Sequence, residues 1–190
     1  MARLKQLRLC GIGGQGLVTA GTILGNAGII DKKYVSGSDS YGVRVRGGYA
    51  LSDVVISDEP IVFPHVMEAD ILISMSQEAY DNHIDTVSTD GVVIYDDQLV
   101  IAHTREDIKQ VGISATATAI KELNQKQTAS IIMLGALVAI TGVVSKDAIL
   151  KAIRENMNER FHDLNLKAIE IGYNIGEKRW QSLEEPISQQ

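Results

Sequence analysis

The chain has 190 residues, of which 45% are hydrophobic and 22% charged, and its 18 Lys and Arg against 24 Asp and Glu give a formal net charge of −6. This length and composition are typical of one globular domain with a sizeable core, and they exclude a collagenous or disordered chain. An acidic chain without a long basic run cannot neutralise a row of phosphates, so we expect no nucleic-acid partner.

The N-terminal part predicts a strand, a glycine-rich turn and a helix. Residues 7–12 form a short apolar run that ends in glycines, and residues 17–30 carry apolar side chains at helical spacing. This helix contains Gly21, Gly25 and Gly28, each of which costs about 1 kcal/mol relative to Ala in a helix interior. Their spacing places them on one face, so we interpret them as a flat stripe that lets the helix lie close against a sheet or another chain.

The middle of the chain predicts further strands. Residues 34–37 indicate a short strand, and residues 38–48 a loop rich in Gly, Ser and Arg. Residues 49–57 are typical of a strand bounded by turn residues. The continuous apolar runs 71–73 and 92–95 are typical of strands that are covered on both faces.

The C-terminal half predicts four helices, over residues 117–123, 129–140, 145–156 and 161–180. Ser145 is a candidate N-cap, with Asp147 favourably placed in the first turn. Strands early in the chain and helices late in it predict a single three-layer α/β domain with a mixed, partly parallel sheet and C-terminal helices. We place this domain at residues 1–182 and expect residues 183–190 to be a frayed tail.

Residues that could bind metals or form disulfides are few. A disulfide, a redox pair and an iron-sulfur site each need two or more thiolates, and Cys10 is the single cysteine. We expect it to be a small buried residue rather than a nucleophile. The four histidines have no partner at zinc-ligand spacing, so no metal site is expected. The longest apolar run, residues 131–144, is too short to cross a bilayer and no secretory segment is evident, which predicts a cytoplasmic protein without a membrane partner.

The first candidate site is a glycine turn at residues 11–16, formed by Gly11, Gly13, Gly14, Gln15 and Gly16. It matches G-x-G-x-x-G between a predicted strand and a predicted helix. Glycine permits positive φ and close approach to the backbone, while an uncapped helix start offers N–H groups to a phosphate or carboxylate. Gln15 could add a side-chain amide. The alternative is that water satisfies these donors and the glycines only close a tight turn.

A nicotinamide or flavin dehydrogenase is disfavoured. Such a fold places an acidic residue about 20 positions after the glycines, at the end of the second strand. Asp31 precedes the second predicted strand and Asp39 lies beyond it, so neither matches well.

The second candidate site is an arginine-glycine loop at residues 40–48, with Ser40, Tyr41, Gly42, Arg44, Arg46, Gly47 and Gly48 as its candidate residues. If residues 44–46 are extended, the two guanidinium groups project from the same side. Such a pair suits a carboxylate or a phosphate. The alternative is that these arginines make ordinary surface or interchain salt bridges.

The order of these motifs resembles the gamma subunit of the 2-oxoacid:ferredoxin (acceptor) oxidoreductases. The resemblance covers nearly the whole chain and rests on the glycine turn with Ala20-Gly21, Ser40-Tyr41-Gly42, Arg46-Gly47-Gly48, Ser57-Asp58 with Ile61 and Pro64, Ala69-Asp70, and Leu134-Gly135-Ala136-Leu137. The segment Met75–Tyr80 is similar to the version found in 2-oxoglutarate-type gamma subunits. It favours 2-oxoglutarate over pyruvate, branched-chain 2-oxoacids and indolepyruvate.

The resemblance implies a subunit of an enzyme that oxidatively decarboxylates a 2-oxoacid with coenzyme A, giving acyl-CoA, CO2 and reduced ferredoxin. It implies that this chain holds no cofactor alone, that thiamine diphosphate, Mg and iron-sulfur clusters lie on partner subunits, and that coenzyme A is a co-substrate. The implied partners are alpha and beta subunits, a delta subunit in complexes that have one, and ferredoxin through the complex. The isolated chain is then expected to be inactive.

Under this interpretation the chain has no catalytic residue, and the two glycine-rich segments face a ligand or a subunit interface. Two alternatives stay open. One is a standalone nucleotide- or coenzyme-binding module without redox activity. The other is an assembly scaffold whose glycine-rich loops only fit a partner.

Overall fold

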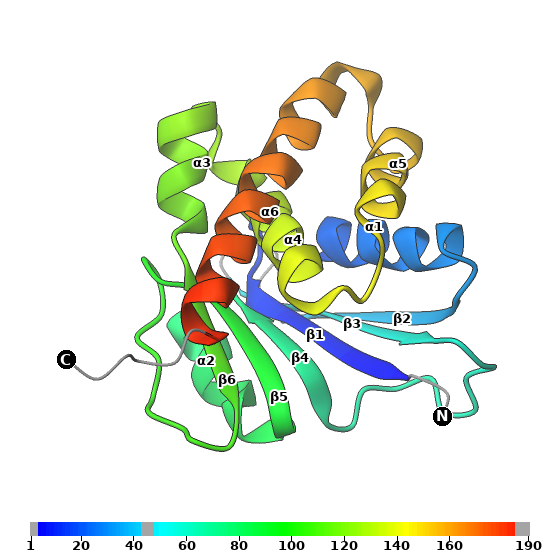
Figure 1. Ribbon diagram of the computed structural model, residues 1–190, viewed down its shortest axis with the longest axis vertical. Helices are drawn as coiled ribbons and strands as arrows, with labels where there is room; N and C mark the ends of the chain where they lie inside the picture. Colours follow the sequence, from blue (N-terminus) through cyan, green and yellow to red (C-terminus); the bar gives the residue numbers. More distant parts are fainter. Residues whose placement is uncertain (1–3, 43–47, 185–190) are drawn as a thin grey trace.

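A computed structural model describes residues 4–42 and 48–184, and its centre is one mixed sheet (Figure 1). The strands are β1 (Lys5–Ile12), β2 (Tyr34–Tyr41), β3 (Tyr49–Ser57), β4 (Ala69–Ser74), β5 (Val87–Asp96) and β6 (Lys109–Ile113). Their order across the sheet is β2-β3-β1-β4-β5-β6. β3 is antiparallel to both of its neighbours, whereas β1, β4, β5 and β6 are mutually parallel. The predicted mixed, partly parallel sheet is thereby confirmed.

Helices cover both faces of this sheet. They are α1 (Leu17–Ile30), α2 (Gln77–His83), α3 (Ala115–Leu123), α4 (Ala129–Thr141), α5 (Lys146–Asn156) and α6 (His162–Glu184), with short 3-10 turns η1 (Ile84–Thr86), η2 (Lys126–Thr128) and η3 (Glu159–Phe161). Figure 1 shows α2 below the sheet and the C-terminal helices with α1 above it. Among the described residues, no helix combines the length and the apolar character needed to span a membrane.

Side-chain alternation along the strands divides the core into these layers. Leu7 and Leu9 of β1 belong to the large cluster under α1 and α4. Cys10 belongs instead to the cluster under α2, together with Leu72 of β4 and Tyr80 of α2. Because successive strand residues point to opposite faces, one buried strand serves two helical layers, which confirms the predicted three-layer domain.

The glycines of α1 allow the helix to lie close to the sheet, as their spacing predicts. A Cβ on Gly21 would collide with Ser52 of β3, and one on Gly28 would lie 2.8 Å from Val35 Cγ2 of β2. Gly25 has more room, since its Cβ would lie 3.4 Å from Val35 Cγ1. The stripe therefore faces the sheet of this same chain.

Several predicted bounds need correction. β2 continues to Tyr41, so Ser38–Tyr41 form strand rather than loop, because their backbone pairs with β3 despite a sequence of small polar residues. β6 and α2 were not predicted at all. α6 continues through Leu183 and Glu184, two residues past the expected start of the tail.

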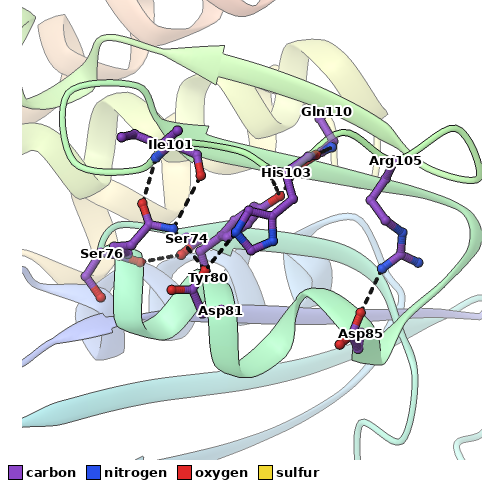
Figure 2. A network of polar contacts seen from close by, with 10 residues as sticks. Ser74, Ser76, Tyr80, Asp81, Asp85, Ile101, His103, Arg105 and Gln110 are labelled. Carbon is purple, nitrogen blue, oxygen red and sulfur yellow. Dashed lines mark hydrogen bonds and ion pairs between the residues drawn. The ribbon is translucent and has the colours of Figure 1, made fainter.

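A network of polar contacts fixes the long connection between β5 and β6 on α2 (Figure 2). The Tyr80 hydroxyl donates to Gln110 Oε1 at 2.7 Å and accepts from the His103 backbone N–H at 3.0 Å. The Ile101 N–H donates to the Gln77 side chain at 2.7 Å. These bonds hold β6 in place, and β6 in turn sets where α3 begins.

Candidate functional site

The glycine turn lies where β1 ends and α1 begins. Gly14 has φ of +98° and Gly16 has φ of +80°, a region that L side chains rarely adopt. Gly16 is the N-cap of α1, and no side chain caps this helix. The first N–H groups of α1 are therefore left to water or to a ligand.

Gln15 closes the turn instead of reaching outward. The Ile12 N–H donates to Gln15 Oε1 at 2.8 Å, and Gln15 Nε2 donates to the Met75 carbonyl at 2.7 Å. We call these two bonds of Gln15 the clamp. A Cβ on Gly11 would collide with Gln15 Oε1, so only glycine at position 11 leaves room for the clamp. The expectation that Gln15 presents its amide to a ligand is corrected, because the carbonyl oxygen and one N–H are already bonded within the chain.

The clamp spans the point where the chain changes faces of the sheet. After β1 the chain enters α1 above the sheet, and after β4 it enters α2 below it (Figure 1). In open α/β sheets, ligands bind at such a switch point, beyond the carboxyl ends of the parallel strands. The glycine turn and Met75 lie at this place.

The structure joins the glycine turn to one end of the arginine-glycine loop. The Gly13 N–H donates to the Gly48 carbonyl at 2.6 Å, and the Gly42 N–H donates to the Tyr49 carbonyl at 2.7 Å. Gly42 and Gly48 thus stand at the two sides of a hairpin whose base contacts the turn. Arg44, Arg46 and Gly47 lie outside the described residues.

Ser40 and Tyr41 are placed differently from the glycine turn. Both belong to the outer strand β2, and β3 separates that strand from β1. Tyr41 is 67% exposed, so its ring is free of the core. These two residues flank the hairpin and do not line the crevice beside Gly14.

A pocket of about 240 Å³ with a mixed polar and apolar lining opens beside the glycine turn, and we name it the polar pocket for its Thr116, Lys126 and Gln127. One wall is the backbone of Gly13 and Gly14, and the opposite wall comes from α3, η2 and α4, with Thr116, Lys126, Gln127 and Ala129. Lys126 is exposed at this mouth. A lysine ammonium together with the uncapped N–H groups at the start of α1 suits an anionic group.

A second pocket, of about 380 Å³, lies on the other side of the turn. It shares Gly14 and Gln127 with the polar pocket but is lined mainly by apolar groups of α4, α5–α6 and η3, including Ile131, Met157, Phe161 and Leu164. Phe161 is 40% exposed. The two pockets meet at Gly14 and together make a groove whose second half is the more apolar.

A buried carboxylate positions the wall that faces the turn. Asp96, at the end of β5, is fully buried and accepts from the Thr116 N–H at 2.8 Å and from the Thr116 hydroxyl at 2.5 Å. The carboxylate thereby caps α3 from a neighbouring strand. Its oxygens are used within the fold, which makes Asp96 a positioning residue rather than a ligand contact.

Tyr49 at the start of β3 and His83 of α2 are uncharged near neutral pH. The Tyr49 hydroxyl contacts His83 Nε2 of α2. Burial raises the pKa of Tyr49 to about 12 and lowers the pKa of His83 below its ordinary value. This contact ties α2 to the start of β3 without adding a charge.

Metal-binding and thiol chemistry can be examined among the described residues. They contain no group of three or more His, Cys, Asp or Glu side chains that could hold a metal ion. Cys10 is buried below the sheet, and burial raises the pKa of its thiol to about 12, so the reactive thiolate is not formed near neutral pH. The site can bind and orient an anionic group.

The sequence interpretation missed the wall opposite the turn. Lys126 and Gln127 lie in a short connection without hydrophobic periodicity, and Thr116 begins a helix whose start depends on β6. The sequence marked residues 124–128 only as the gap between two predicted helices, and it did not indicate that they form part of a site. Strand order alone brings them to the glycine turn.

Known proteins match almost the whole chain. The family model described as pyruvate ferredoxin/flavodoxin oxidoreductase matches residues 6–175. The 2-oxoglutarate synthase subunit KorC of Methanocaldococcus jannaschii is 41% identical over 177 residues, which are 92% of this chain and 95% of that protein. The resemblance to the oxidoreductase gamma subunits is thereby confirmed, and the alternative of a standalone binding module is not supported.

Solved structures agree with the fold. The gamma subunit of a keto/oxoacid ferredoxin oxidoreductase from Geobacter sulfurreducens has a TM-score of 0.80 and 36% identity, covering 90% of this chain and 98% of that one. A 2-oxoglutarate:ferredoxin oxidoreductase chain from Magnetococcus marinus has a TM-score of 0.84 and 21% identity, covering 93% of this chain and 31% of that one. The latter likeness concerns the fold. Sequence, site and architecture together show that the chain belongs to the pyruvate ferredoxin/flavodoxin oxidoreductase family.

Proposed function

We propose that this chain is the gamma-type subunit of a 2-oxoglutarate:ferredoxin oxidoreductase. The complex would oxidatively decarboxylate 2-oxoglutarate with coenzyme A, giving an acyl-CoA, CO2 and reduced ferredoxin. The relative from Methanocaldococcus jannaschii, a 2-oxoglutarate synthase subunit, supports this substrate. The similarity of Met75–Tyr80 to 2-oxoglutarate-type gamma subunits points the same way.

The observation that carries the proposal is a groove built for binding and not for bond cleavage. Its polar half offers the backbone of Gly14, the uncapped start of α1 and the ammonium of Lys126. Such donors bind an anionic group, and charge-assisted bonds of this kind contribute about 1.5–3 kcal/mol each. The reacting groups of the enzyme must then come from other chains.

An iron-sulfur cluster does not fit the residues of this chain. An iron-sulfur cluster needs several thiolates, and the single cysteine is buried with a protonated thiol. We therefore assign thiamine diphosphate, Mg and the clusters to alpha and beta partner subunits, with a delta subunit where the complex has one. Ferredoxin would meet the complex rather than this chain. We place the enzyme in the cytoplasm and expect the isolated chain to be inactive.

We assign the polar pocket to a phosphate of coenzyme A and the apolar pocket to side chains of a partner subunit. The related Magnetococcus marinus enzyme was solved with 2-oxoglutarate, coenzyme A and succinyl-CoA bound. A phosphate matches the donors around Gly14, whereas Met157, Phe161 and Leu164 offer an apolar surface without a fixed charge. Arg44 and Arg46 of the arginine-glycine loop stay candidate contacts for the same anionic ligand.

The test is purification of a tagged chain from its native cell. We expect partner chains that carry a thiamine diphosphate site and ferredoxin-type cysteines to copurify, with activity on 2-oxoglutarate that exceeds activity on pyruvate. Removing this chain from the complex should abolish the coenzyme A-dependent reaction. A chain that purifies alone and turns over 2-oxoglutarate by itself would contradict the proposal, as would a complex that acts on pyruvate and not on 2-oxoglutarate.

A further inference from the structure

The connection between β3 and β4, residues 58–68, displays apolar side chains at the edge of the sheet opposite the groove. It leaves the carboxyl end of β3, which pairs with the start of β1, and enters the amino end of β4 (Figure 1). Leu4, Val62, Phe63 and Met67 are exposed there, and Val62 is 96% exposed. These four side chains line one hollow of about 370 Å³, and we call them the apolar patch.

The connection that carries the patch is fixed to the sheet. Ile61 and Val66 turn inward and belong to a small buried cluster below β3. Arg8 Nη2 donates to the Val66 carbonyl at 3.2 Å, and the Met67 N–H donates to Gln6 Oε1 at 2.7 Å. Because the backbone is already held, a partner that binds the outward side chains pays little to order them.

The patch differs from the other exposed apolar side chains of the chain. Ile101, in the connection between β5 and β6, and Ile120, on α3, are also exposed but belong to separate elements. Single apolar side chains on a surface are ordinary, whereas a contiguous group of them marks an interaction site. Four apolar side chains around one hollow are of the second kind.

The rim of the apolar patch is acidic. Glu59 lines the hollow, Glu68 follows Met67 directly, and both glutamates are exposed. Within residues 4–42 and 48–184, no Lys, Arg or His side chain forms an ion pair with either carboxylate. Two carboxylates therefore stand ready for a cation that another chain brings.

The lysines at the same edge of the sheet do not balance this rim. Lys5 Nζ lies 3.1 Å from Asp70 Oδ1, and Lys33 Nζ lies 3.7 Å from Asp58 Oδ1. Each of these lysines has an aspartate of its own. The charge of the two glutamates is thus left over, and it complements Lys or Arg on a partner surface.

We propose that the apolar patch is the docking site for a segment of a partner subunit that carries an apolar side chain flanked by Lys or Arg. The apolar side chain would fill the hollow, and the cation would pair with Glu59 or Glu68 at its rim. An apolar centre inside a polar rim is the usual plan of a protein interface. The proposal rests on the proposed function in one respect, since it requires a complex of several subunits.

The charge of the rim selects this occupant over three others. A second copy of this chain would set the acidic rim against itself, because a two-fold contact joins identical surfaces. An anionic membrane surface and a nucleic acid would both be repelled by the two glutamates. The patch and the groove lie at opposite edges of the sheet, so a subunit docked on the patch leaves the groove open to its ligand.

Photocrosslinking in the complex purified from its native cell tests the proposal. Phe63 is replaced by p-benzoylphenylalanine, which links to whatever chain contacts it on illumination. We expect a link to a partner subunit, and sequencing of the linked peptide should show an apolar residue beside Lys or Arg. The matched control carries the same photoreactive residue at Ile101, which is 83% exposed and lies outside the patch, and it should not capture that peptide.

Competition for a place in the complex gives the second readout. In cells that also make the untagged wild-type chain, a tagged chain with Phe63→Glu should enter the complex about tenfold less than the tagged wild type. Glu59→Lys should act in the same direction, whereas Glu106→Lys, at an exposed glutamate between β5 and β6, should not. Thermal unfolding of the variants should match the wild type, because all three positions are exposed.

The results that would overturn this proposal differ from those that contradict the proposed function. An assembled complex that acts on 2-oxoglutarate but gives no link from position 63 would overturn the docking site alone. A link to a second copy of this chain, to residues 1–3 of the same chain, or to a partner segment without Lys or Arg would do the same. A link of the expected kind in a complex without 2-oxoglutarate activity would support the docking site and contradict the proposed function.

Discussion

At the scale of single residues, the most consequential polar contact outside the groove is the ion pair between Arg8 of β1 and Asp53 of β3. Arg8 Nε and Nη2 each donate to a different carboxylate oxygen at 2.8 Å, and both side chains are only 12% exposed. The hydrogen bond to Asp53 raises the pKa of Arg8. Because both side chains are largely shielded from solvent, water cannot take the place of the missing partner when one of the two charges is removed.

Breaking this pair should therefore cost much more than breaking a surface pair. Arg8→Ala leaves a buried carboxylate alone and should lower the free energy of unfolding by about 3–5 kcal/mol. Lys151→Ala removes the exposed pair with Glu155 and should cost less than about 1 kcal/mol. Urea denaturation of both variants measures the difference, and equal losses would show that Arg8 and Asp53 are well solvated.

The buried thiol of Cys10 gives a pH-dependent prediction. Its pKa is raised from 9.0 to about 12 in the folded chain, so the unfolded chain loses this proton first as the pH rises. The stability should be unaffected below about pH 9 and fall between about pH 9 and 12. Cys10→Ala should show a smaller alkaline loss than the wild type, and the burial of Tyr49, which raises its pKa to about 12, leaves part of the alkaline loss in both. Parallel stability curves above pH 9 would exclude a buried thiol.

The sequence predicted the state of a residue where that state depends on its neighbours in the chain. It did not predict contacts between segments that are far apart in the sequence. The buried state of Cys10 followed from its place inside an apolar strand. The clamp formed by Gln15 did not, because its partner Met75 is 60 positions away. Lys126 was missed for the same reason, since only the fold brings it to the glycine turn.

At the scale of elements, propensity and pairing decide different parts of the fold. α1 and β3 have the predicted bounds because apolar periodicity and flanking turn residues mark them. The second half of β2 consists of small polar residues and becomes a strand only through its ladder with β3. β6 and α2 are too short, at five and seven residues, for a periodic pattern to show.

Close helix packing gives a prediction at this scale. A Cβ on Gly172 of α6 would collide with the backbone of Ile132 in α4, which cannot move aside as a side chain could. Gly172→Ala should therefore destabilise the fold by about 1–3 kcal/mol or more despite its gain in helix propensity. Gly25→Ala has room and should be neutral or stabilising by up to about 1 kcal/mol. Thermal unfolding at low protein concentration compares the two, and a harmless Gly172→Ala would contradict the close crossing of α4 and α6.

At the scale of the whole molecule, the strand order of the sheet decides where the groove lies. The carboxyl ends of the parallel strands carry the groove around Gly14, at the switch point between β1 and β4. The outer edge of β2 lies on the other side of the sheet from β6 and does not belong to this groove.

The central claim is that the glycine turn is where this chain meets the chemistry carried by its partners. Gly14 and Gly142 provide a matched pair for testing it. Both have positive φ, and a Cβ at either position would have no atom within 4 Å, so neither Gly14→Ala nor Gly142→Ala creates a steric clash. The φ of +98° at Gly14 lies farther from the left-handed region that L residues adopt than the +58° of Gly142, so the free energy of unfolding of both variants is measured alongside to separate strain from lost binding. Gly142 ends α4, away from the glycine turn.

The most direct measurement is the KM for coenzyme A, together with subunit affinity, of the assembled enzyme carrying each variant. We predict that Gly14→Ala raises this KM or the dissociation constant of the subunit about tenfold, equivalent to about 1.4 kcal/mol, while Gly142→Ala changes neither. An unchanged KM and unchanged assembly in Gly14→Ala would contradict the account.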